Sequence, residues 1–220
     1  MAKVATPYGT RAIQAIGGRP FSGGTIREFK VAANNTAAIF NGDLVVLSSA
    51  GLPSAVSASP VGQILAATSV APTAGIVGVC VGANYVSAEG QPVINQYLPA
   101  NVITGGGSEV SVMVMDDPEV LFQVKGTEAL GTFNSGTNGS GWPGVIGKNA
   151  TLGYATAGNT TTGNSGVNLI VGTNGAGIVA TANRAVRIVD IVKGTEDDLY
   201  PEFIVKLNVG VHSYDNALGV

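Results

Sequence analysis

The chain has 220 residues, long enough for one substantial core or one large all-β domain, and only 11% of its residues are charged, less than half the usual share. Its net charge is −3 and it contains no basic run, which excludes the phosphate-neutralising stripe that nucleic-acid binding needs. Cys80 is the single cysteine, which excludes an intrachain disulfide framework and a cysteine-based zinc site.

Residues 1–21 carry little secondary-structure signal, and we expect them to form an extended N-terminal arm on a single domain that spans residues 1–220. A proline and a glycine stand where a secretory signal would need an apolar core, so we expect no cleavable export segment. The next segments, IREFKV (26–31) and GDLVVL (42–47), have the composition of short β-strands.

Residues 64–86 are uncharged over a length that could span a membrane. Proline, glycines and small polar residues dilute their hydrophobicity, and no aromatic or basic anchors flank them, so we predict a loop followed by a buried strand. In the strand, valines alternate with Gly78, Cys80 and Gly82. The face opposite the valines therefore carries almost no side-chain volume, which predicts that another backbone or sheet packs closely against it.

Two segments with a period of two residues follow, EVSVMVM (109–115) and VLFQVKG (120–126). Each alternates as a half-buried strand does. Between them, DDPE (116–119) places Asp and Pro in turn positions. The two segments therefore predict an antiparallel hairpin.

The run 131–183 has Lys148 as its only charge and is rich in Gly, Asn, Thr and Ser, which predicts long loops interrupted by short strands. Within it, GNTTTGNSGV (158–167) has the glycine spacing of a phosphate-binding loop. However, Asn164 replaces the lysine that would reach the phosphates, and the residues after Ser165 favour a strand over the required helix. We interpret the segment as a loop that does not bind a nucleotide.

Near the C-terminus, residues 184–194 and 201–210 predict two long strands joined by TEDDLY (195–200). The second strand is expected to turn four side chains inward: Phe203, Val205, Leu207 and Val209. The chain thus contains at least seven predicted strands and no amphipathic helix of ten or more residues. This pattern predicts an all-β fold, a β-sandwich that is jelly-roll-like or barrel-like, with long Gly/Asn/Thr-rich loops.

Residues that could perform chemistry are few. His212, the only histidine, lies beside Ser213 in a terminal segment, and such an isolated imidazole is typical of a surface or interface residue. The acidic residues gather in turns, where Asp bonds the local backbone. One cluster could offer oxygen ligands to a metal such as calcium but lacks EF-hand spacing: Glu196, Asp197 and Asp198. We therefore expect no enzyme activity and no cofactor.

Eight sequence blocks occur in order between Pro7 and Val220: PYGTRAIQAIGG, GDLVVLSSAG, GVCVGANYV, GQPVINQYLPAN, MVMDDPEVLFQVK, TTTGNSGVNL, RAVRIVDIVKG and FIVKLNVGVHSYDNALGV. Together they resemble virion structural proteins of short-tailed bacteriophages, including cyanophages, and within that group the capsid cement (decoration) proteins. The resemblance implies a homotrimeric β-sandwich protein that binds the major capsid protein on the outer face of an icosahedral shell and reinforces it. Such a protein is made in the bacterial host cytoplasm and resides on the outer capsid surface of the virion.

The sparse charge of the chain suits burial between subunits. The N-terminal arm carries aromatic and arginine side chains of the kind that anchor interfaces, and we hypothesise that it contacts the shell or a neighbouring protomer. The expected anchors are Tyr8, Arg11, Arg19 and Phe21. An ordinary mobile terminus is the alternative.

Two other functions stay open. A phage receptor or glycan-binding module, such as a head fibre or a tailspike-like protein, would present exposed aromatic rings beside amides and acids to a host-surface glycan; the candidates are Trp142, Tyr154 and Tyr85. Trp142 also suits a core or loop anchor. A polysaccharide hydrolase would need two carboxyl groups facing each other about 5 to 10 Å apart across a groove.

Overall fold

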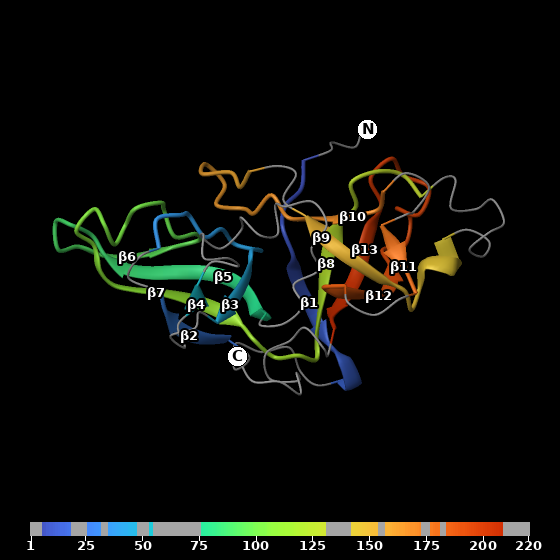
Figure 1. The fold of residues 1–220 in the computed structure, drawn as a ribbon, viewed down its shortest axis with the longest axis horizontal. Helices are drawn as coiled ribbons and strands as arrows, with labels where there is room; N and C mark the ends of the chain where they lie inside the picture. Colours follow the sequence, from blue (N-terminus) through green and yellow to red (C-terminus); the bar gives the residue numbers. More distant parts are fainter. Residues whose placement is uncertain are drawn as a thin grey trace.

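The computed structural model describes residues 6–18, 26–31, 35–47, 53–54, 76–130, 142–153, 157–172, 177–180 and 184–208. These residues form two antiparallel β-sheets and two short 3-10 helices, η1 (Ile16–Gly18) and η3 (Trp142–Val145). The two sheets occupy the two halves of the long axis in Figure 1, and their strands run in different directions. The predicted all-β, sandwich-like fold is confirmed.

The first sheet has seven strands and draws on both ends of the chain. Its hydrogen-bonded order is β1 (Arg11–Ala15), β8 (Val120–Lys125), β13 (Glu202–Leu207), β12 (Val186–Ile191), β9 (Asn149–Gly153) and β10 (Asn168–Ile170), with β11 (Ile178–Val179) also paired to β9. The predicted C-terminal strand pair is confirmed as β12 and β13. In β13, Phe203, Val205 and Leu207 are buried, as expected, and Val209 lies outside the described residues.

The second sheet has six strands from the first 115 residues. Its order is β2 (Ile26–Lys30), β7 (Ser108–Met115), β5 (Ile76–Val86), β3 (Leu44–Leu47) and β4 (Pro53–Ser54), with β6 (Pro92–Asn95) also paired to β5. The bare face predicted on β5 is confirmed at Gly78, where an added Cβ would lie 2.0 Å from the carbonyl oxygen of Met115. Within the part of the chain that the structure describes, no helix is long and apolar enough to cross a membrane.

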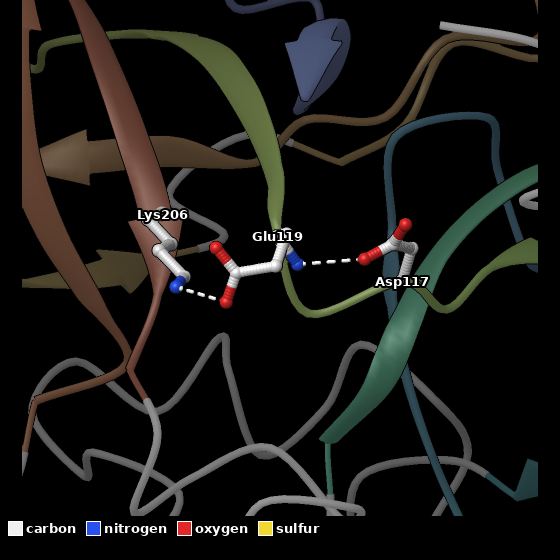
Figure 2. Close-up of polar contacts among 3 residues, drawn as sticks. All are labelled: Asp117, Glu119 and Lys206. Atoms are coloured by element: carbon white, nitrogen blue, oxygen red, sulfur yellow. Dashed lines mark hydrogen bonds and ion pairs between the residues drawn. The ribbon is translucent and has the colours of Figure 1, made fainter. Parts of the chain in front are cut away.

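The hairpin predicted for residues 109–126 is wrong, because its two strands belong to different sheets. β7 pairs with β2 and β5, whereas β8 pairs with β1 and β13. The connecting residues 116–119 do turn the chain, since Asp117 Oδ1 accepts a 2.8 Å hydrogen bond from the Glu119 backbone amide (Figure 2).

Ion pairs tie the two ends of this connection to different sheets. Arg27 of β2 pairs with the buried Asp116, while Lys206 of β13 pairs with Glu119 at 2.7 Å (Figure 2). The segment therefore passes the chain from the six-stranded sheet to the seven-stranded sheet. One cluster of buried hydrophobic side chains spans both sheets, so they share a core.

Part of the expected N-terminal arm has regular structure. Residues 11–15 form β1, which pairs with β8, and Ala15 at its end is buried. Residues 1–5 and 19–21 lie outside the described residues.

Candidate functional site: a polar groove beside Tyr85

Tyr8 and Arg11 of the predicted contact set lie together at the start of β1. The guanidinium carbon of Arg11 stands 4.5 Å above the centroid of the Tyr8 ring, a cation–π contact, and Arg11 is exposed. The Tyr8 hydroxyl is buried near Glu202, and both its burial and the negative charge of Glu202 raise the pKa of Tyr8 above its usual value. The other two predicted anchors, Arg19 and Phe21, lie outside the described residues.

Two of the three aromatic residues proposed to contact glycan are among the described residues. Trp142 begins the helix η3, and Tyr154 lies outside the described residues. Tyr85 is a partly buried residue of β5 that packs against the hydrophobic core and lines a groove of about 800 Å³. Because one of the three proposed residues lines this groove, we take it as the candidate site.

The groove lies at one end of the six-stranded sheet, where β2, β7 and β5 meet the loop before β7. Its lining combines aliphatic, aromatic and polar side chains: Glu28, Lys30, Val31, Asn84, Tyr85, Val86, Pro92, Ile103, Gly107, Ser108, Glu109, Val110 and Ser111. A volume of this size is typical of small-molecule sites.

Strand register explains how distant polar residues reach the same surface. Lys30 of β2 is opposite Ser111 of β7, and Ser111 is opposite Asn84 of β5. Asn84 in turn is opposite Ile94 of β6, a residue that is 79% exposed. Residues directly opposite each other share one face of a sheet. The four side chains therefore form a row across the open face of the sheet.

Several polar side chains in the groove have no partner within the described part of the protein. Ser111 Oγ lies within hydrogen-bond distance of the Glu28 carboxylate and of the Asn84 carbonyl oxygen, and its single hydroxyl hydrogen is donated to one of them at a time. By contrast, the side chains of Lys30, Asn84 and Glu109 make no hydrogen bond or ion pair with another described residue.

Glu109 also has an uncommon backbone conformation. Its φ is +51°, in the left-handed region that residues with a Cβ rarely adopt. Beside it, the loop turns sharply, with hydrogen bonds from Gly105 to Asn101 (2.7 Å) and from Gly107 to Val102 (2.8 Å). Backbone strain of this kind is often found at binding sites.

A second group of titratable residues lies deep between the sheets. Asp43 is buried, and loss of solvation raises its pKa to about 7 although Ser165 and the Phe40 amide donate to its carboxylate. Burial, reinforced by the charge of Asp43, raises the pKa of the Cys80 thiol to about 12. A fully buried, protonated thiol is a poor nucleophile, so we assign these residues to packing.

The loop at residues 158–167 has a structural role, and its predicted lack of a helix is confirmed. After Ser165 the chain enters strand β10, so no helix N-terminus is present there to hold a phosphate. Asn159 Oδ1 instead accepts backbone hydrogen bonds from Thr161 (2.8 Å) and Thr162 (3.1 Å). This arrangement closes the loop on itself.

The predicted acidic cluster lies in the turn between β12 and β13. Glu196 accepts a 2.6 Å hydrogen bond from the Gly194 amide, which fixes the turn. Among the described residues, which include Asp197 and Asp198, no group of three or more His, Cys, Asp or Glu side chains is placed to hold a metal ion. His212 lies outside these residues.

The sequence singled out Tyr85 as a candidate for glycan contact, and the other residues of the groove were not predicted. The neighbouring Asn84, an amide near the end of a largely apolar strand, was the available signal. Lys30 and Glu109 are far from Tyr85 in the sequence, and strand register places Lys30 on the same face of the sheet as Asn84. No local pattern marks them.

Comparison with known proteins finds no matching family model, no matching curated protein and no matching solved structure.

Proposed function

We propose that the chain is a virion structural protein: a homotrimeric capsid cement that binds the major capsid protein on the outer face of an icosahedral phage shell. It stabilises the shell against the pressure of the packaged DNA. Three copies held together engage several coat subunits at once, so modest affinity at each contact becomes strong attachment overall.

The observation that carries this proposal is the open edge of the seven-stranded sheet at β1. No described strand pairs with the outer edge of β1, and a strand edge of this kind is where a neighbouring chain can add a strand. The Tyr8–Arg11 pair stands at one end of this edge, and Ile16, 38% exposed, follows the other. Aromatic and arginine side chains beside an apolar residue are typical of interface anchors.

The low charge of the chain supports the same proposal. Only 11% of its residues are charged, and charged residues are depleted at the centres of protein interfaces. A protein that buries much of its surface against its own copies and against a shell needs fewer solubilising charges than a free monomer.

Two charge-reversal variants test the role of β1. Arg11→Glu places a negative charge at the proposed interface, and Lys193→Glu makes the same change in net charge at the exposed turn after β12. Deletion of residues 2–20 is unsuitable, because it would remove β1 from the sheet.

Co-sedimentation with phage shells that lack the cement protein provides the measurement. We expect Arg11→Glu to reduce binding at least tenfold and Lys193→Glu to bind like the wild type. Equal binding of both variants would exclude β1 as the attachment surface.

A further inference from the structure

We infer that two copies of this chain associate through the outer edge of β2, where their six-stranded sheets join into one continuous antiparallel sheet across a two-fold axis. Among the described residues, β2 is the last strand on its side of the sheet, and it lies at the lower border of that sheet in Figure 1. A strand edge of this kind is where another chain can add a strand. The hydrogen-bonding pattern and the charges of β2 indicate which chain it fits.

The pairing of β2 with β7 determines which of its backbone groups face outward. The Val31 amide donates a 3.1 Å hydrogen bond to the carbonyl oxygen of Val110, the residue opposite it when the β2–β7 register is continued by one position. Hydrogen-bonded and non-hydrogen-bonded pairs alternate along an antiparallel ladder. Phe29 therefore directs its backbone groups toward β7, whereas those of Glu28 and Lys30 point to the outer edge.

The two outward positions carry opposite charges. Glu28 and Lys30 are both exposed, and they lie on the same face of the sheet because side chains alternate along a strand. When a second β2 strand is placed antiparallel to the first, with the two-fold axis at Phe29, Glu28 of each copy lies opposite Lys30 of the other. The junction then contains two ion pairs, each at a position where the backbones also exchange hydrogen bonds.

The charges of β2 select this register over its neighbours. A two-fold axis at Arg27, Glu28 or Lys30 would place two identical charges directly opposite each other, which is unfavourable. An axis midway between two residues would set outward-facing backbone groups against inward-facing ones and break the ladder. The axis at Phe29 avoids both penalties.

Phe29 supplies the apolar part of the same junction. It is half-buried and packs against the hydrophobic core, on the face opposite Glu28 and Lys30. In the proposed register the two copies of Phe29 form a non-hydrogen-bonded pair, the kind in which opposite side chains lie closest. Aromatic pairs across strands are stabilising. The junction thus has an aromatic contact on one face and ion pairs on the other.

The mixture of charges argues against a purely protective role. Charged side chains on an edge strand commonly prevent pairing with other chains. Charges of a single sign would serve that purpose against a second copy in every register. β2 instead carries both signs, at a spacing that makes the strand complementary to itself, so the partner it fits is a second copy of this chain.

This contact is separate from the proposed trimer and shell interface, which lies at β1 in the seven-stranded sheet. A contact about a two-fold axis joins copies in pairs and cannot close a ring of three, so it doubles whatever species the β1 interface forms. The pairing is expected to be weak, because a strand of five residues buries far less than the roughly 1,200 Å² of a stable interface.

Sedimentation equilibrium of the full-length protein between about 10 μM and about 1 mM tests the inference. We expect the average mass to rise with concentration toward twice the mass of the species present at the lowest concentration, and to rise less at high salt. A mass that stays constant over this range would overturn the inference. A single chain that only doubles would support the β2 contact and contradict the trimer, so the two proposals can fail separately.

Charge-reversal variants assign the association to β2. Glu28→Lys leaves positive side chains at positions 28 and 30, and Lys30→Glu leaves negative ones at both, so neither variant should associate with itself. An equimolar mixture of the two should associate like the wild type, because every pair across the junction again joins opposite charges. Lys193→Glu makes the same change in net charge as Lys30→Glu, at the exposed turn after β12, and should associate like the wild type.

The mixture also controls for folding, since two misfolded variants would not restore the association of the wild type. Circular dichroism of each variant alone checks this directly. Self-association of both single variants, or failure of the folded variants to associate when mixed, would overturn the assignment to β2.

Discussion

Ser165 donates a 2.5 Å hydrogen bond from its hydroxyl group to Oδ1 of Asp43, a residue 122 positions earlier in the chain. The same hydroxyl oxygen accepts a 3.0 Å hydrogen bond from the Val167 amide, and the Ser165 amide donates to the Asn41 carbonyl oxygen at 2.8 Å. The loop at residues 158–167 is thereby fastened to the residues that enter β3. Loss of this contact should therefore lower the stability of the whole fold.

Ser165→Ala should lower the free energy of unfolding by about 2 to 4 kcal/mol. The substitution leaves a buried carboxylate oxygen and a buried amide each without a partner, and an unsatisfied buried group costs about 1 to 3 kcal/mol. Thr161→Ala, an exposed change in the same loop, should cost less than about 0.5 kcal/mol. Urea denaturation at fixed protein concentration measures both, and equal effects would show that the Ser165 contact contributes little.

Asp43 should make stability depend on pH. Its pKa is about 7 in the folded protein and 3.8 for the unperturbed group, so the folded state retains a proton that the unfolded state releases. Stability should therefore fall as pH rises from about 4 to about 7, by an amount on the order of 4 kcal/mol. The Asn side chain of Asp43→Asn cannot ionise, so the stability of this variant should not show the fall between about pH 4 and about pH 7. The control Asp197→Asn, in an exposed turn, should show the same fall as the wild type. Parallel pH–stability curves for the wild type and Asp43→Asn would contradict this account.

Gly78→Ala should disrupt the pairing of β5 with β7. The new methyl group would lie 2.0 Å from the Met115 carbonyl oxygen, so the backbone of β7 would have to shift, at a cost of about 3 kcal/mol or more. Gly90→Ala is the control for the steric clash. The methyl group added at residue 90 would meet no atom within 4 Å, so only the φ of +80° disfavours alanine there. It should cost about 1 to 2 kcal/mol. Thermal unfolding distinguishes the two, and equal shifts in Tm would argue against close strand contact.

The Lys206–Glu119 ion pair, visible in Figure 2, should contribute little although it lies where the connection between the sheets enters the seven-stranded sheet. Glu119 is 40% exposed, and ion pairs open to solvent contribute less than about 1 kcal/mol. A double-mutant cycle with Lys206→Met and Glu119→Gln should give a coupling energy in this range that falls at high salt. A coupling energy above about 2 kcal/mol that is insensitive to salt would require a different explanation for the connection.

The strands could be predicted from the sequence where apolar and polar residues alternate along consecutive positions. β12 and β13 alternate clearly and are separated by a short polar turn, so both their existence and their pairing follow from nearby residues. The same reasoning failed for β7 and β8. Turn residues predict a change of direction, but the sheet that the next strand joins is determined by contacts such as Arg27–Asp116, which are 89 positions apart.

The candidate site was predictable only in part for the same reason. Tyr85 and Asn84 are adjacent, and their chemistry is visible in the sequence. Lys30 lies on the same face as Asn84 because β2, β7 and β5 pair in one particular register, and a shift of one residue would turn it to the other face. Ser165 and Asp43 were missed because a buried Asp at a strand entrance looks like an ordinary turn residue until its partner is known.

The oligomeric mass of the full-length protein tests the central claim most directly, because a cement that reinforces a shell through several simultaneous contacts needs several copies held together. Native mass spectrometry of the recombinant chain should give a species of three times the 22.0 kDa chain mass that survives dilution. A mass of one chain at every concentration would contradict the proposal that this protein is a trimeric capsid cement.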